Sequence, residues 1–226
     1  MCCRRWVFAS NQGMPEKLAI KAPPESTRQT ILLTALKLFH DDGIDAVKLL
    51  RISAESGSGN TAAVHYYFKN KDGLIQALLD FLDANIWQPA YQQLEEVLAG
   101  EPDIKEVLYV GLWPTNRIAF DFPWGADAQS FMFHIATGAN LEYKHALDTI
   151  TAPQQSLCRN AVRALVPALS DDVFDVRWNF VLTGATFGLH ASTRLLRLEE
   201  GWTLASEKKY VEYMLDYVVG GLTAPA

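Results

Sequence analysis

The sequence predicts an all-α protein in which an N-terminal helix-turn-helix domain of three helices precedes a larger helical domain. Apolar residues recur at helical spacing through most of the chain, and glycine and proline separate the periodic segments. No segment shows the alternation of apolar and polar residues that is typical of a half-buried strand. Residues 48–71 contain two short helical patterns joined by a glycine turn, which is the arrangement of a helix-turn-helix.

The first helix of this domain is expected to begin at Ser26, because Ser26 and Gln29 fit a capping box. It is expected to end at Gly43, since glycine readily adopts the conformation that closes a helix. Its apolar residues recur three and four positions apart, as one buried helix face requires. These residues are Ile31, Leu32, Ala35, Leu36 and Phe39.

Three more helices are expected directly after the first. The second runs roughly from Lys48 to Ser56, and the third begins after Asn60, a good N-cap, and ends near Phe68. A fourth follows almost at once and either stops at Trp87, before Pro89, or continues past a kink there. We therefore expect a tail over residues 1–25, a helix-turn-helix domain over 26–82 and a helical domain over 83–226.

Six further helical segments are expected in the larger domain, separated by glycine and proline, which interrupt helices. Their expected ranges are 90–99, 103–120, 126–149, 154–168, 171–198 and 205–219. The expected breaks between them are residues 100–102, residues 122–125, Pro153, Pro167 and Gly201, and the pair Gly220-Gly221 is expected to end the last helix.

Charge is distributed unevenly along the chain. The net charge is −6, so bulk charge does not attract a polyanion to the whole molecule. Residues 1–80 carry ten Lys and Arg against eight Asp and Glu, whereas residues 81–226 carry ten against eighteen. A weakly basic front and an acidic rear suit a small DNA-reading module on a larger body that does not contact DNA.

The three cysteines, Cys2, Cys3 and Cys158, do not form a disulfide framework, which favours a reducing compartment. No apolar run reaches the roughly 18 residues that a membrane span needs. The five residues after Arg4 and Arg5 are too few for the core of a signal peptide. We therefore expect a soluble cytoplasmic protein. No Cys or His pair has metal-ligand spacing, and no cofactor is indicated.

The third helix is expected to have one packing face and one free face. Val64 and Phe68 lie four residues apart and can pack on neighbouring helices. The side chains that then point elsewhere are those of Thr61, His65 and Tyr66, with Tyr67 at the margin. Tyr66 can serve packing, phosphate contact or both. Aromatic and cationic groups close together on a short helix suit a nucleic-acid backbone and groove.

Other residues of the same stretch suit a contact with DNA. Ala62 is small enough to approach a groove edge or a thymine methyl group closely. Lys48 and Lys71 stand at helix starts, where backbone N–H groups and the helix dipole favour a phosphate. The candidate DNA-binding residues are Lys48, Arg51, Asn60, Thr61, Ala62, His65, Tyr66, Tyr67 and Lys71.

Three stretches within residues 26–82 form a recognisable pattern: RQTILLTALKLFHDDG, ISAESG and AVHYYFKNKDGL. This pattern resembles the DNA-binding domain of the TetR family of bacterial transcriptional regulators. The last stretch is the most specific, because two aromatics and a phenylalanine followed by Lys-Asn-Lys and a leucine are typical of the family. The resemblance covers about a quarter of the chain.

The resemblance implies that the helix matching Asn60–Phe68 enters the major groove. It also implies a homodimer whose C-terminal helices bind a small molecule that alters operator affinity. Positions implied to contact bases or phosphates are Thr61, Ala62, His65, Tyr66, Tyr67 and Lys71. The chain departs from the family pattern at the turn Gly57–Asn60, which is one residue longer, and at Lys48, which replaces a capping Ser or Thr.

An effector pocket is the first site expected in the larger domain. Aromatic residues gather near Trp113 and in residues 131–134. Such a cluster is more often core than ligand site, but the resemblance favours the ligand site. Its candidate residues are Trp113, Phe131, His134 and Phe187.

A dimer interface is the second site expected in the larger domain. Segment 171–198 is apolar on nearly every side, and a helix of that kind must be covered on two sides. We expect this segment and 205–219 to form a four-helix interface with their symmetry mates, although a core helix in a monomer is the alternative. The candidate residues are Phe180, Gly184, Gly188, Tyr210, Met214 and Tyr217.

Together these expectations favour a repressor that binds a palindromic operator as a homodimer and is relieved by a small apolar ligand. An alternative is a DNA-binding dimer without a small-molecule effector, either constitutive or regulated by a protein partner. An enzyme is a remote alternative, because the sequence has no nucleophile elbow, phosphate loop or metal-ligand spacing.

Overall fold

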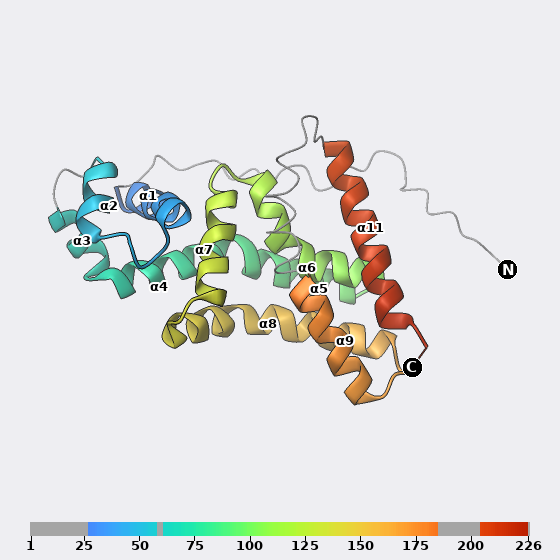
Figure 1. The fold of residues 1–226 in the computed structure, drawn as a ribbon. Coiled ribbons are helices and arrows are strands. Elements are labelled where there is room, and N and C mark those ends of the chain that lie inside the picture. The colour runs from blue at the N-terminus through green and yellow to red at the C-terminus, as the bar shows by residue number, and fades with distance from the viewer. Residues whose placement is uncertain (1–26, 58–60, 185–203, 226) are drawn as a thin grey trace.

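The computed structural model describes residues 27–57, 61–184 and 204–225. Every regular element in these ranges is a helix, which confirms the all-α class. Figure 1 shows α1 to α4 gathered at one end of the molecule and α9 and α11 near the other, with α7 and α8 extending between them.

The head, residues 27–82 without 58–60, contains the four helices that the sequence predicts. They are α1 (Thr27–Asp42), α2 (Leu49–Glu55), α3 (Thr61–Phe68) and α4 (Lys71–Leu82). Gly43 closes α1 as expected, with φ of 81° and its backbone N–H donating to the Phe39 carbonyl at 3.0 Å. The expected capping residue Ser26 lies outside the described residues.

The helix α4 continues into the body without a break. A π-helical turn, η1 (Asp83–Trp87), connects it to α5 (Gln88–Leu98), which carries Pro89 in its first turn. Proline lacks an N–H and its ring collides with the carbonyl four residues back, so a widened turn before Pro89 lets the helix pass. This confirms the alternative in which the fourth helix continues past Pro89.

The body, residues 83–225 without 185–203, holds the remaining helices. They are α6 (Ile104–Asp121), α7 (Gly125–Thr137), α8 (Leu141–Leu165), α9 (Asp171–Thr183) and α11 (Leu204–Thr223), after η1 and α5. The expected segment 103–120 is confirmed by α6. The part of the expected segment 171–198 beyond residue 184 lies outside the described residues.

The expected single helix over 126–149 is wrong, because residues 138–140 separate α7 from α8. The backbone N–H of Gly138 closes α7 on the His134 carbonyl at 2.9 Å. The Asn140 side chain then caps α8 by accepting from the backbone N–H groups of Glu142 and Tyr143 at 2.9 and 3.2 Å. Gly138 is thus a helix-ending residue and Asn140, two positions later, is an N-cap for the next helix.

Two expected breaks are also wrong, because the helices continue through them. Pro153 lies inside α8, where Thr151 and Gln154 beside it are buried and anchor the same helix on both sides. Gly220-Gly221 lies inside α11, whose end is held by Arg177. The Arg177 guanidinium donates to the carbonyls of Leu222 and Ala224 at 3.1 and 2.6 Å. In both cases tertiary contacts outweigh a local helix-breaking preference.

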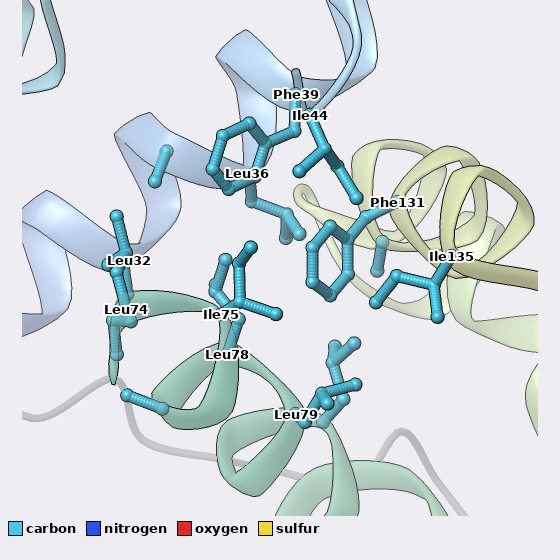
Figure 2. Packing of buried hydrophobic residues seen from close by; sticks show 14 of the residues in the cluster. Leu32, Leu36, Phe39, Ile44, Leu74, Ile75, Leu78, Leu79, Phe131 and Ile135 are labelled. Carbon is cyan, nitrogen blue, oxygen red and sulfur yellow. The ribbon is translucent and has the colours of Figure 1, made fainter. Parts of the chain in front are cut away.

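One hydrophobic cluster joins the head to the body across the predicted boundary at residue 82. It combines α1 and α4 with Ile118 of α6 and with buried residues of α7. Figure 2 shows Phe39 of α1 facing Phe131 of α7, and their stacked rings have centroids 5.8 Å apart. A second cluster fills the body between α5, α6, α8, α9 and α11.

The junction of α3 and α4 depends on a glycine. Lys69 has φ of 64° and the Asn70 side chain caps α4 by accepting from the Gly73 backbone N–H at 2.8 Å. A Cβ atom on Gly73 would lie 2.0 Å from the Phe68 carbonyl oxygen. Only a residue without a side chain lets the first turn of α4 lie this close to the end of α3.

We therefore expect Gly73→Ala to lower the free energy of unfolding by about 1–3 kcal/mol, although alanine is the better helix former. Urea denaturation followed by circular dichroism measures the change. Gly100→Ala is the matched control, because its Cβ would meet nothing closer than the Val97 carbonyl at 3.5 Å. Equal stability of the two variants would contradict the close approach.

Candidate nucleic-acid interface

The helix α3 divides into a buried and an exposed face, as the sequence predicts. Val64 and Phe68 are buried in the cluster shared with α1 and α4. His65 is exposed, and 82% of Tyr66 and 40% of Tyr67 are accessible to solvent. Packing through Val64 and Phe68 thus fixes α3 while its outer face stays available.

The other candidates at the start of α3 are described in part. Thr61 begins the helix and Ala62 is exposed, so its small side chain leaves room for a partner to approach. Asn60, the expected N-cap, lies outside the described residues.

The two tyrosines are arranged as a surface pair. The ring centroids of Tyr66 and Tyr67 lie 5.1 Å apart in an edge-to-face arrangement, and Tyr67 lies 6.0 Å from the buried Phe68. Tyr67 therefore links the core to Tyr66, which projects furthest. A large exposed aromatic side chain beside cations is typical of a contact surface, because exposing the apolar ring to water in the free protein is unfavourable.

The candidate cations on α2 differ in what they contact. Lys48 is exposed at the N-cap of α2 and makes no side-chain capping hydrogen bond. Arg51 donates to Asp42 at 2.6 Å and to Glu55 at 2.7 Å. Hydrogen bonds from the guanidinium to Glu55 and then Asp42 raise the pKa of Arg51. Arg51 is thus engaged within the head, whereas Lys48 can turn toward a phosphate.

Lys71 lies at the first position of α4 and is half-buried. Its Nζ lies 3.4 Å from the Asp45 carbonyl oxygen and 6.0 Å from the centroid of the Phe39 ring. Burial lowers the pKa of Lys71, and the charges of Asp45 and Asp72 oppose this shift. The ammonium of Lys71 therefore contacts the α1–α2 loop and is not simply solvated.

Two cations beside α3 were not among the sequence candidates. The Arg28 guanidinium lies 5.5 Å from the centroid of the Phe68 ring, although α1 and α3 are far apart in the sequence. Lys69 is exposed in the turn after α3. Lys69 is part of the Lys-Asn-Lys motif, so the sequence could have indicated it. No feature of the sequence near Arg28 indicates that Arg28 lies beside α3.

The candidate effector residues are not brought together. Trp113 belongs to the second hydrophobic cluster and Phe131 to the first, and both are buried. His134 is half-buried with its ring 6.4 Å from that of Phe133. Phe187 lies outside the described residues.

A groove of about 360 Å³ opens elsewhere, between α8 and α9. Trp178 and Leu182 of α9 supply much of its apolar lining, and α8 supplies mostly polar side chains. The residues from α8 are Asp148, Thr151, Ala152, Gln155, Ser156 and Arg159. Its size suits a small ligand.

Two candidate dimer residues are among the most exposed large apolar groups in the described part of the body. Phe180 of α9 is 73% exposed and Tyr217 of α11 is 84% exposed. Val176 and Tyr213, which were not candidates, are exposed one helical turn before them. We call these four side chains the apolar stripes of α9 and α11.

The remaining dimer candidates are placed as follows. Gly184 caps the end of α9, and no atom of the described residues lies within 4 Å of where its Cβ would stand. Met214 is partly buried against the second cluster. Tyr210 belongs to α11, and Gly188 lies outside the described residues.

Other kinds of site find no support in the described part of the chain. No helix there is long and apolar enough to cross a bilayer. Nor do three or more His, Cys, Asp or Glu side chains there converge on a position for a metal ion. The head, in contrast, has the geometry of a helix-turn-helix DNA-binding protein: a fixed short helix with an exposed polar and aromatic face.

Comparison with known proteins matches the head to a family of regulators. Residues 31–78 match the family described as bacterial regulatory proteins, tetR family. The HTH-type nicotine-responsive transcriptional repressor HdnoR of Paenarthrobacter nicotinovorans is 29% identical over 82 residues, which are 36% of this chain and 40% of that protein. The alignment thus spans less than half of the relative's length.

Solved structures share the fold over almost the whole chain. Mycobacterium smegmatis AmtR superposes with a TM-score of 0.60 at 15% identity, covering 91% of this chain and 90% of that one. The TetR family regulator PfmR from Thermus thermophilus gives 0.59 at 17% identity, covering 89% and 98%. The head therefore matches the tetR family of bacterial regulatory proteins, and the solved structures show that most of the chain shares the fold of such proteins.

Substitutions on the two faces of α3 are expected to change the stability of the fold by different amounts. We expect Val64→Ala to lower the free energy of unfolding by about 1–3 kcal/mol, because it leaves a cavity in the core. Tyr66→Ala should change it by less than about 0.5 kcal/mol, because the side chain is exposed. Urea titrations of both variants measure this difference. A larger loss for Tyr66→Ala than for Val64→Ala would show that the helix faces are assigned the wrong way round.

Proposed function

We propose that this protein is a cytoplasmic transcriptional repressor that binds a palindromic DNA operator as a homodimer. The observation that carries the proposal is α3, whose inner face is buried while His65, Tyr66 and Tyr67 project outward. A short helix held in this way can enter the major groove without losing the packing of its own domain.

Within this proposal the exposed groups have separate tasks. Ala62, His65 and Tyr66 face base edges and the sugar–phosphate backbone in the groove, and Lys48 contacts a phosphate beside it. Lys71 completes the phosphate contact from the start of α4 by turning away from the Asp45 carbonyl. The acidic body keeps the rest of the molecule away from the DNA, which directs binding to the head.

A homodimer is supported by the apolar stripes of α9 and α11. Exposed apolar patches on neighbouring helices are typical of a protein interface, and each stripe lies opposite a buried face of its own helix. Covering both stripes with a symmetry mate gives a four-helix interface. One short α3 reads only a few base pairs, so a second copy is needed to specify an operator.

A small-molecule effector is the finer part of the proposal. The relative HdnoR is described as nicotine-responsive, and the groove between α8 and α9 has room for a small ligand. Several contacts connect the body to the head and provide a route for transmitting binding. Among them are the Phe39–Phe131 stack, the His40 Nδ1 contact with Ser130 Oγ at 2.7 Å, and the Tyr143 hydroxyl donating to Asp72 at 2.5 Å.

The effector acts only if it binds the DNA-competent and DNA-incompetent arrangements with different affinity. Because α8 carries both the groove residues and Tyr143, a displacement of α8 reaches the first turn of α4 directly. A DNA-binding dimer without an effector shares every feature of the head and differs only in this response.

The cations and tyrosines of the head should affect DNA binding differently. We expect Lys48→Ala to weaken binding to operator and non-operator DNA alike and to reduce the slope of log K against log[salt] by about one. Tyr66→Ala should weaken operator binding with less change in that slope. Fluorescence anisotropy at several salt concentrations measures both. Lys105→Ala on α6 is the control, and a loss of affinity equal to that of Lys48→Ala would contradict the assignment.

The dimer interface predicts a change in mass. Phe180→Asp and Tyr217→Asp should each shift the protein from dimer to monomer, because a carboxylate would be buried without a partner in the interface. Sedimentation velocity measures the mass. Leu141→Asp is the matched control, since Leu141 is also largely exposed but lies at the start of α8. A dimer that survives both stripe substitutions would refute this interface.

A further inference from the structure

The His65 ring makes one hydrogen bond within the described part of the protein, and that bond fixes its tautomer. Its Nδ1 lies 2.7 Å from the carbonyl oxygen of Lys69, four residues later. A carbonyl oxygen only accepts, so Nδ1 must carry the proton and donate. In the neutral ring the other nitrogen, Nε2, therefore keeps its lone pair.

The same bond stabilises the turn that orients α4. Lys69 has φ of 64°, a left-handed conformation that costs a residue with a side chain more than it costs glycine. The Lys69 backbone N–H donates back to the His65 carbonyl at 3.0 Å, so the two residues are joined by hydrogen bonds in both directions. His65 thus closes α3 and holds Lys69 in the conformation that lets Asn70 cap α4.

The His65 side chain lies on the exposed outer face of α3, which it shares with Ala62 and Tyr66. Among the described residues no group is hydrogen-bonded to Nε2. A change of tautomer would break the hydrogen bond from Nδ1 to the Lys69 carbonyl. The ring is therefore held with Nε2 as an acceptor before any partner binds. In the major groove the complementary donors are the exocyclic amino groups of adenine and cytosine.

We propose that His65 is a specificity-determining residue that accepts a hydrogen bond at Nε2 from the amino group of an adenine or cytosine in the operator. The Nδ1–H bond to the Lys69 carbonyl sets the tautomer that makes this possible. The inference rests on the proposed DNA-binding function for its partner, but the tautomer and the turn belong to the free protein. The same ring therefore stabilises the turn between α3 and α4 through Nδ1 and contacts a base through Nε2.

The tautomer is tested without DNA. Two-dimensional ¹⁵N–¹H NMR correlation of the ring nitrogens, assigned with His65→Ala, should show the proton on Nδ1 and an unprotonated Nε2 in the neutral ring. A proton on Nε2 would overturn the inference while leaving the repressor function intact. Failure to bind any selected DNA would instead overturn the repressor function, and the base contact with it.

Two substitutions separate the roles of the ring nitrogens. In His65→Asn the amide nitrogen stands where Nδ1 stood and can still donate to the Lys69 carbonyl, whereas His65→Gln reaches toward Nε2 and loses that bond. We expect His65→Asn to be the more stable variant, although glutamine is the better helix former. Greater stability of His65→Gln in urea denaturation would contradict the role of the turn.

The base contact is tested with operators that lack single amino groups. Each adenine is replaced in turn by purine and each cytosine by 2-pyrimidinone, and affinity is measured by anisotropy. At one position in each half-site the wild-type protein should lose roughly tenfold in affinity, as expected for one lost hydrogen bond in a closed interface. His65→Asn should show no further loss at that position.

Two results would contradict the base contact. If no amino-group deletion distinguishes the wild-type protein from His65→Asn, Nε2 does not read a base. If His65→Asn also lowers the salt slope by about one, the ring contacts a phosphate as an imidazolium, and the proposal is wrong.

Discussion

The packing of Val64 and Phe68 beneath α3 is the interaction on which the rest of the structure depends. These two side chains fix α3 against α1 and α4, so that the helix is held rigidly although it has only eight residues. An isolated helix of this length would not be stable in water. Burial on one face therefore supplies the stability that leaves the other face free to carry exposed His65 and Tyr66.

The carbonyl of Phe68 also sets the start of α4, which lies against it through Gly73. From there α4, η1 and α5 form one continuous helical path into the body, and the cluster around Phe39 and Phe131 fills the space beside it. The head and body thus share a core instead of a flexible linker. A displacement of α7 or α8 would have to move the head or repack that core, because closely packed interiors transmit strain.

The sequence was sufficient for the head because its signals are local. Asn70 caps α4, Gly43 ends α1, and the spacing of Val64 and Phe68 defines the inner face of α3. The sequence was insufficient where contacts between residues distant in the sequence determine where a helix ends. Helix α8 runs through Pro153 because residues on both sides of the proline are buried, and α11 runs through Gly220-Gly221 to an end held by Arg177.

The residues of the candidate interface also divide into those that local sequence predicts and those that only the fold reveals. Exposure of His65 and Tyr66 followed from helical spacing, whereas Arg28 was missed because only the fold brings α1 over Phe68.

The central claim is that two copies of α3 read DNA from a single dimer. Hydroxyl-radical footprinting on an operator selected from genomic fragments tests it most directly. We expect two protected half-sites related by symmetry, with centres about one helical turn (roughly 34–36 Å) or a multiple of it apart along the duplex. Protection of one unrepeated site, or of no site at concentrations where the protein is dimeric, would contradict it.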